Sequence, residues 1–132
     1  AYKNVTCLNK AIWNREVNMS IKDTGTGNWG LQTIVVESAD ATTISGVTIE
    51  QVMQISQFPE IDFLKIDIEG AEEDLFKENF ETWLPKTKVI AIELHDTEEH
   101  KVSRPFFKAI ENRQNRQYYL GENLICEFEV DG

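Results

Sequence analysis

Two runs of apolar residues in the middle of the chain are nearly uninterrupted by polar positions. They cover Phe63 to Ile68 and Val89 to Leu94. Each is followed by a stretch in which apolar residues recur at helical spacing, about 70–84 after the first run and about 103–114 after the second. Continuous apolar strands that alternate with helices are typical of a parallel sheet covered on both faces. The pattern therefore predicts an α/β fold.

A further helix is predicted before the first buried strand, over about 48–56. Thr48 and Gln51 have the spacing of a capping box, in which two side chains three positions apart satisfy backbone groups at the start of a helix. Ile49 and Met53 contribute to its apolar face. This helix is expected to lead directly into the first buried strand.

Two antiparallel hairpins are predicted, one on each side of this unit. Over about 16–37, two strand-like segments, the first with alternating apolar and polar residues, flank a loop rich in glycine, which is typical of a half-buried hairpin. Near the C-terminus, 117–120 and 123–130 flank Gly121 and are expected to pair. Residues 1–132 are thus expected to form a single domain with a hairpin insertion at about 16–37.

The overall charge disfavours several classes of partner. The chain carries 13 basic and 23 acidic residues, a formal net charge of −10. Nucleic acids and anionic membranes both attract basic surfaces, so neither is expected as a partner. No apolar stretch approaches the roughly 18 residues of a membrane span. The two cysteines, Cys7 and Cys126, have no CxxC spacing, and free thiols of this kind favour a reducing, cytoplasmic location.

Acidic residues follow both buried strands directly. Asp67 and Glu69 come at the end of the first strand, and Glu93, His95 and Asp96 come at the end of the second. In open α/β sheets ligands bind beyond the carboxyl ends of the strands. Neighbouring carboxylates can serve as acid, base, metal ligand or hydrogen-bond acceptor, and a histidine beside them could act as a base near neutral pH. The structural alternative is that Glu69 caps the next helix and His95 merely bonds to a neighbouring acid.

Other candidates are weaker. Glu72, Glu73 and Asp74 fall in the first turn of the helix predicted after the first strand, where the helix dipole favours negative charge. Trp29, in the glycine-rich loop, could cover a substrate or pack within its hairpin. The sequence has no GxGxxG, Walker or GxSxG motif, which disfavours nucleotide-phosphate binding and serine-hydrolase chemistry. The acidic rim of the sheet is therefore the main candidate site.

The sequence around the first buried strand resembles a family signature. "FLKIDIEGAE", from Phe63 to Glu72, closely resembles the signature of the FkbM-type methyltransferases, usually a run like LLKIDVEGAE. The segments "VTIEQVM" before it and "VIAIELH" after it resemble the family's flanking segments. The early "KAIWNREVNMSI" is similar to the segment after the family's third strand. The resemblance spans nearly the whole chain.

This resemblance implies a Rossmann-like class I methyltransferase sheet that uses S-adenosyl-L-methionine (SAM), often to methylate a hydroxyl oxygen of a sugar or another small metabolite. The site residues that it implies are catalytic Asp67, Glu69 and His95, cofactor-binding Asp67, Ala11 and Ile12, and acceptor-binding Glu93. Glu72 and Trp29 are predicted as further acceptor-binding residues from their places in the sequence rather than from the resemblance. Methyl transfer would be in line and would depend on positioning. Asp67 or His95 would accept the hydroxyl proton, and no metal ion is expected.

The family's first two strands have no counterpart in the sequence. In the strand order 3-2-1-4-5-7-6 that the resemblance implies, their absence bares one edge of the strand Phe63–Ile68. The chain is therefore expected to be the C-terminal portion of such an enzyme and to bind SAM poorly by itself. The bare edge is expected to be covered by Val5–Leu8, by a missing N-terminal segment or by a second copy in a homodimer. A partner chain is favoured because so apolar a strand requires burial.

Two other functions are alternatives to methyl transfer. One is a non-catalytic α/β binding or interaction domain derived from a methyltransferase, which upstream sequence without a glycine-rich cofactor motif would favour. The other is a metal-binding hydrolase with oxygen and imidazole ligands from Asp67, Glu69, Glu93 and His95. Metal analysis of the purified protein discriminates this second alternative.

Overall fold

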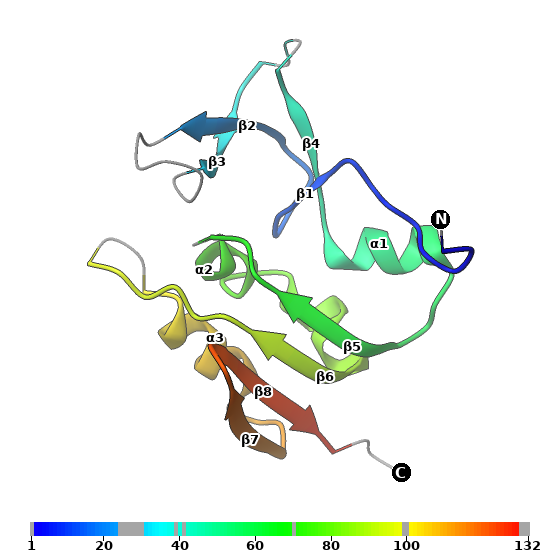
Figure 1. Ribbon diagram of the computed structural model, residues 1–132, viewed down its shortest axis with the longest axis vertical. Helices are drawn as coiled ribbons and strands as arrows, with labels where there is room; N and C mark the ends of the chain where they lie inside the picture. Colours follow the sequence, from blue (N-terminus) through cyan, green and yellow to red (C-terminus); the bar gives the residue numbers. More distant parts are fainter. Residues whose placement is uncertain are drawn as a thin grey trace.

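The computed structural model describes residues 2–23, 31–38, 40, 42–69, 71–98 and 101–129. Its strands form two four-stranded sheets, ordered β1-β4-β2-β3 and β5-β6-β8-β7 (Figure 1). The first sheet contains β1 (Ala11–Ile12), β2 (Asn18–Asp23), β3 (Leu31–Val36) and β4 (Ile44–Val47). The second contains β5 (Ile61–Ile66), β6 (Thr87–Ile92), β7 (Asn115–Leu120) and β8 (Asn123–Phe128). The α-helices are α1 (Ile49–Ser56), α2 (Glu72–Leu75) and α3 (Ser103–Ile110).

The first sheet is built around the hairpin of β2 and β3. These strands pair antiparallel from Asn18 opposite Val36 to Asp23 opposite Leu31, within the range where the alternating pattern predicts a hairpin. β4 lies antiparallel to β2 and parallel to β1. The approach of β4 to the chain before β2 requires Gly46, because a Cβ atom there would lie 2.9 Å from the carbonyl oxygen of Val17.

Helix α1 begins where the sequence predicts. The backbone N–H of Gln51 donates to Thr48 Oγ1 over 3.1 Å, and the backbone N–H of Thr48 donates to Gln51 Oε1 over 3.0 Å, so the capping box is confirmed. The helix ends at Gln57, which takes a left-handed conformation with φ of 60°. Ile49 and Met53 are buried and anchor α1 in the core.

The hydrophobic core lies on one face of the second sheet. Helix α1, the segment after α2 and helix α3 pack against that face. β5 and β6 are parallel, and β8 runs antiparallel to both β6 and β7, so the predicted C-terminal hairpin is present in a mixed sheet. The core cluster includes Ile66, Ile90, Ile92, Leu124, Cys126 and Phe128 from the strands and Phe76, Trp83, Leu84, Phe106 and Ile110 from the segments between them. The edge-to-face rings of Phe76 and Phe106, 5.0 Å apart, join the segment after α2 to α3.

The opposite face of this sheet is exposed at its two edge strands, where Phe63 on β5 is 60% exposed and Tyr118 on β7 is 38% exposed. At the centre of the same face, Ala91 on β6 and Ile125 on β8 are buried. The predicted burial of both faces therefore fails at β5 in the part of the chain that the structure describes. Among the described strands, β5 pairs only with β6 and forms the edge of its sheet. Val5–Leu8 does not cover that edge as a strand, since these residues are exposed and form no strand.

The helix predicted over about 70–84 is interrupted. α2 spans only Glu72–Leu75 and is followed by 3₁₀ turns at Phe80–Thr82 and Leu84–Lys86. Between them Asn79 adopts a left-handed conformation with φ of 62°, which a continuing helix cannot contain. Its side-chain amide donates to the distant carbonyl oxygen of Asn14 over 3.0 Å, so a tertiary contact stabilises the break. The apolar spacing correctly indicates burial but not an uninterrupted helix.

Helix α3 also ends earlier than its predicted limit near residue 114. The segment after Ile110 is held by Arg113, whose guanidinium donates to the carbonyl oxygens of Leu84 (2.6 Å) and Thr87 (3.2 Å). The same guanidinium lies 3.9 Å from the ring centre of Phe128 on β8.

Among the described residues, none of the helices is both long and apolar enough to cross a lipid bilayer.

Candidate active site at the ends of β5 and β6

The carboxyl ends of β5 and β6 lie side by side. Their register pairs Ile66 with Ile92, the last residue of each strand. The backbone N–H of Glu93 extends the pairing by donating to the carbonyl oxygen of Ile66 over 3.1 Å. Residues that follow the two strands are therefore held at the same edge of the sheet, as the α/β pattern predicts.

His95 stands among the acidic side chains of this edge. Its Nε2 atom lies 3.4 Å from Glu93 Oε1, 3.8 Å from Glu69 Oε2 and 3.9 Å from Asp67 Oδ1. Its Nδ1 atom lies 3.1 Å from Glu72 Oε1. The side chain of His95 is 22% exposed, so solvent reaches the imidazole only partly. The structure thus brings the acids after β5 into contact with the histidine after β6.

Glu72 orients the imidazole of His95 through a hydrogen bond. Its side chain is fully buried, and its Oε1 atom accepts a hydrogen bond of 2.8 Å from the backbone N–H of Ile68. An ionised carboxylate has no proton to donate, so Nδ1 of His95 is the donor in the hydrogen bond between the two side chains. This arrangement leaves Nε2 directed at the exposed carboxylates. The contact of His95 with a neighbouring acid, anticipated as a structural alternative, is therefore present.

The pKa of His95 lies above its ordinary value. Burial lowers the pKa, because it penalises the charged imidazolium. The hydrogen bond and the negative charge of Glu72, together with the charges of Glu69 and Glu93, raise it and outweigh burial. A larger fraction of His95 is therefore protonated at neutral pH than of an isolated histidine.

Asp67 and Glu69 are the accessible acids of the cluster. Their side chains are 42% and 47% exposed, and Asp67 Oδ2 also forms an ion pair of 3.2 Å with Lys65 Nζ. The sequence analysis missed Lys65 as a partner, although it is the one charged residue inside the run Phe63–Ile66. Glu69 has a positive φ of 55°, and a non-glycine residue in this conformation stores backbone strain of the kind that is often found at functional sites.

Three side chains of the cluster have the geometry of a cation site. Asp67, Glu93 and His95 each offer one ligand atom, and these atoms lie within 4.8 Å of one another. Lys65 and a protonated His95 also neutralise these acids, so the cluster has a source of positive charge within the chain. The positions of these side chains fit both a bound cation and neutralisation by Lys65 and His95.

The remaining predicted site residues lie elsewhere or outside the described part of the chain. Ala11 and Ile12 form β1, are half buried, and pair with Gly46 and Val47 of β4. Trp29 lies outside the described residues. Glu72, expected on the acceptor side, is buried beneath His95. Asp96 turns away from the cluster to Ser103, whose backbone N–H donates to Asp96 Oδ1 at the start of α3.

Comparison with known sequences defines the class of the protein. The sequence model described as "Methyltransferase FkbM domain" matches residues 12–120 of the 132-residue chain. By this match the chain carries a methyltransferase domain. It belongs to the FkbM methyltransferase family, as the signature from Phe63 to Glu72 predicts. No curated protein and no solved structure matches the chain.

Proposed function

We propose that this protein catalyses SAM-dependent methyl transfer to a hydroxyl oxygen of a sugar or another small metabolite. The observation that carries the proposal is the meeting of Asp67, Glu69 and His95 at one edge of the sheet in a chain of this family. A hydroxyl oxygen must lose its proton when it is methylated, so the reaction needs a base at the transfer site. The cluster offers both carboxylate and imidazole for that purpose.

The order of the second sheet supports a Rossmann-like class I fold for the intact enzyme. The order β5-β6-β8-β7 has the same neighbours as strands 4, 5, 7 and 6 of the order 3-2-1-4-5-7-6 that such enzymes have. Within that proposal Asp67, Ala11 and Ile12 bind SAM, which supplies an electrophilic methyl group when bound. The half-exposed oxygens of Asp67 suit a positively charged sulfonium ligand, because opposite charges attract at short range.

In the proposed mechanism the residues of the cluster act on the acceptor hydroxyl or hold one another in place. Asp67 or His95 accepts the proton of the acceptor hydroxyl as its oxygen attacks, and Glu69 and Glu93 orient that hydroxyl through hydrogen bonds. Glu72 is too deeply buried to touch an acceptor, so it acts by holding His95. Trp29 stays a predicted acceptor contact.

If His95 is the base, turnover is expected to rise with pH through its pKa. Because the base acts when deprotonated and its pKa is raised from 6.5, the rise lies at a higher pH than for an ordinary histidine. A pH profile of kcat/KM for the intact enzyme measures this limb. His95→Gln is expected to flatten it, whereas the matched change His100→Gln leaves it in place. An unaltered limb in His95→Gln assigns the titration to another group.

The open edge of β5 supports the further proposal that the chain is the C-terminal portion of the enzyme and needs a partner. An apolar edge strand with unpaired backbone groups is a template for pairing with another strand. In the isolated chain, we propose that a second copy of the chain, rather than an upstream segment, covers the edge of β5. Sedimentation is then expected to show self-association, and calorimetric titration is expected to show weak SAM binding. Tight SAM binding by a monomer contradicts both expectations.

A further inference from the structure

Asn123, the first residue of β8, lies at the same edge of the sheet as the acidic cluster around His95. β8 runs antiparallel to β6, and their register ends with Leu124 opposite Ile92 (Figure 1). One position further along both strands, Asn123 comes opposite Glu93, whose Oε1 atom lies 3.4 Å from His95 Nε2. β8 is therefore a third strand at the edge where β5 and β6 end.

The side chains of Asn123 and Glu93 are on the same face of the sheet. Ile92 and Leu124 both belong to the hydrophobic core, and successive side chains of a strand point to opposite faces. The residues one position away, Glu93 and Asn123, are therefore both on the face opposite the core. Because the backbone N–H of Glu93 donates towards β5, to Ile66, the pair formed with Asn123 is of the type without backbone hydrogen bonds. Side chains of such pairs approach closely.

The side-chain oxygen of Asn123 contributes no hydrogen bond to the fold. This Oδ1 atom is buried and has no hydrogen-bond partner among the described residues. The residue as a whole is only half buried, so the open end of its amide is the NH2 group. A donor is the favourable group at this edge, because the carboxylates nearby would repel an acceptor. Since buried polar groups are normally paired, the amide is better explained by a ligand than by folding.

The cluster lacks a neutral donor during the proposed reaction. Its carboxylates accept hydrogen bonds but cannot donate them. When His95 acts as the base, Nδ1 already donates to Glu72 and Nε2 takes up the proton of the acceptor hydroxyl. Lys65 is a donor, but its charge is paired with Asp67. A second oxygen atom on the acceptor would therefore need a donor from another part of the edge.

We propose that Asn123 is an acceptor-binding residue of the methyl-transfer site, an inference that rests on the proposed function. Its NH2 group donates to the acceptor oxygen next to the hydroxyl that is methylated. Sites that hydrogen-bond a substrate oxygen discriminate against analogues that lack it. The favoured acceptors are therefore molecules with two neighbouring oxygen atoms, such as the adjacent hydroxyl groups of a sugar ring, rather than alcohols with a single oxygen.

Asn123→Ala in the intact enzyme is expected to raise the KM of a sugar acceptor about tenfold and to change kcat by less than about threefold. This is the behaviour of a residue that binds substrate and transition state equally. The free energy of unfolding is expected to be unchanged or higher, because no hydrogen bond to Oδ1 is lost. A residue needed only for folding would show the reverse, with lower stability and a parental KM.

Gln117→Ala is the matched control, because Gln117 lies on the same hairpin but on the other face of the sheet, opposite Cys126 of the core cluster. Its side chain is exposed, and the variant is expected to keep the parental KM and kcat. Steady-state kinetics with D-glucose, D-galactose and D-mannose as acceptors compares the two variants with the parent.

A titration followed by nuclear magnetic resonance tests the inference without turnover. The isotope-labelled intact protein is titrated with the same three sugars and with cyclohexanol, which has a single oxygen. At least one sugar is expected to shift the NH2 signals of Asn123 and the ring signals of His95 together. Cyclohexanol is expected to leave the Asn123 signals in place.

Three results would overturn the inference: sugar binding that shifts His95 without Asn123, no shift with any sugar, or a sugar KM that Asn123→Ala leaves unchanged. Failure of the proposed function gives a different result. A protein that transfers no methyl group but shows both shifts with a sugar would contradict methyl transfer and support sugar binding by Asn123.

Discussion

Asp67→Asn in the intact enzyme is expected to lower turnover at least tenfold. Asparagine keeps the shape of aspartate but loses its negative charge and its basicity, and general base catalysis typically contributes factors of about 10²–10⁴. Steady-state kinetics with SAM and the acceptor measures the effect. The free energy of unfolding is expected to change by no more than about 1 kcal/mol, because the side chain is 42% exposed and its ion pair with Lys65 lies at the surface.

Asp62→Asn is the matched control for this change. Asp62 lies within β5 and, like Asp67, pairs with a lysine, Lys88, but its side chain is 87% exposed and it lies at the start of the strand, whereas Asp67 follows its end. The control is expected to keep parental turnover and stability. If Asp67→Asn also keeps parental turnover, Asp67 is not a catalytic residue.

Glu72→Ala is expected to cause the largest loss of stability, about 3 kcal/mol. The substitution leaves the backbone N–H of Ile68 and Nδ1 of His95 without their shared acceptor in a fully buried position. Glu72→Gln keeps an oxygen that can accept from Ile68, so its cost is expected to be about 1 kcal/mol. Both variants remove the negative charge that raises the pKa of His95 and are expected to lower that pKa.

Denaturant unfolding measures the stability of the Glu72 variants, and the histidine ring resonances measure the pKa. Glu81→Ala is a suitable control, because Glu81 lies in the same connecting segment but is exposed, and its substitution is expected to change stability by no more than about 0.5 kcal/mol. Equal stability of Glu72→Ala and the parent would contradict the structural role of the buried carboxylate.

Local signals in the sequence predicted those elements whose stabilising contacts are themselves local. The capping box of Thr48 and Gln51 marks the start of α1 because both hydrogen bonds join residues three positions apart. The meeting of Asp67 with His95 was also predictable, because parallel strands in register end at one edge of a sheet. The family signature supported the same residues.

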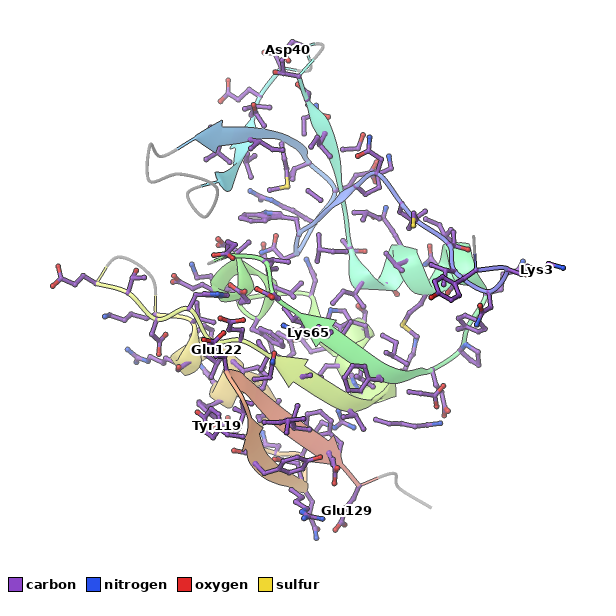
Figure 2. All side chains as sticks on the ribbon, in the orientation of Figure 1. Lys3, Asp40, Lys65, Tyr119, Glu122 and Glu129 are labelled. Atoms are coloured by element: carbon purple, nitrogen blue, oxygen red, sulfur yellow. The ribbon has the colours of Figure 1, made fainter. Side chains whose placement is uncertain are left out.

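The features that sequence analysis missed depend on contacts between distant residues. The break after α2 is stabilised by the hydrogen bond from Asn79 to the carbonyl oxygen of Asn14, 65 positions away. The spacing of apolar residues does not predict a hydrogen bond between polar groups so far apart in the sequence. The role of Glu72 was equally hidden, because it depends on the distance to an imidazole 23 positions away. The open face of β5 was unexpected because an apolar run indicates a need for burial without showing what supplies it (Figure 2).

The fate of the methyl group tests the proposed function most directly. The intact protein is incubated with SAM labelled with carbon-13 in its methyl group and with a panel of monosaccharides and small hydroxyl-bearing metabolites. The account predicts a labelled methyl ether on an acceptor oxygen, formed in equal amount with S-adenosylhomocysteine and strongly reduced by Asp67→Asn. Label that appears only on nitrogen or carbon atoms, or on no acceptor at all, would contradict it.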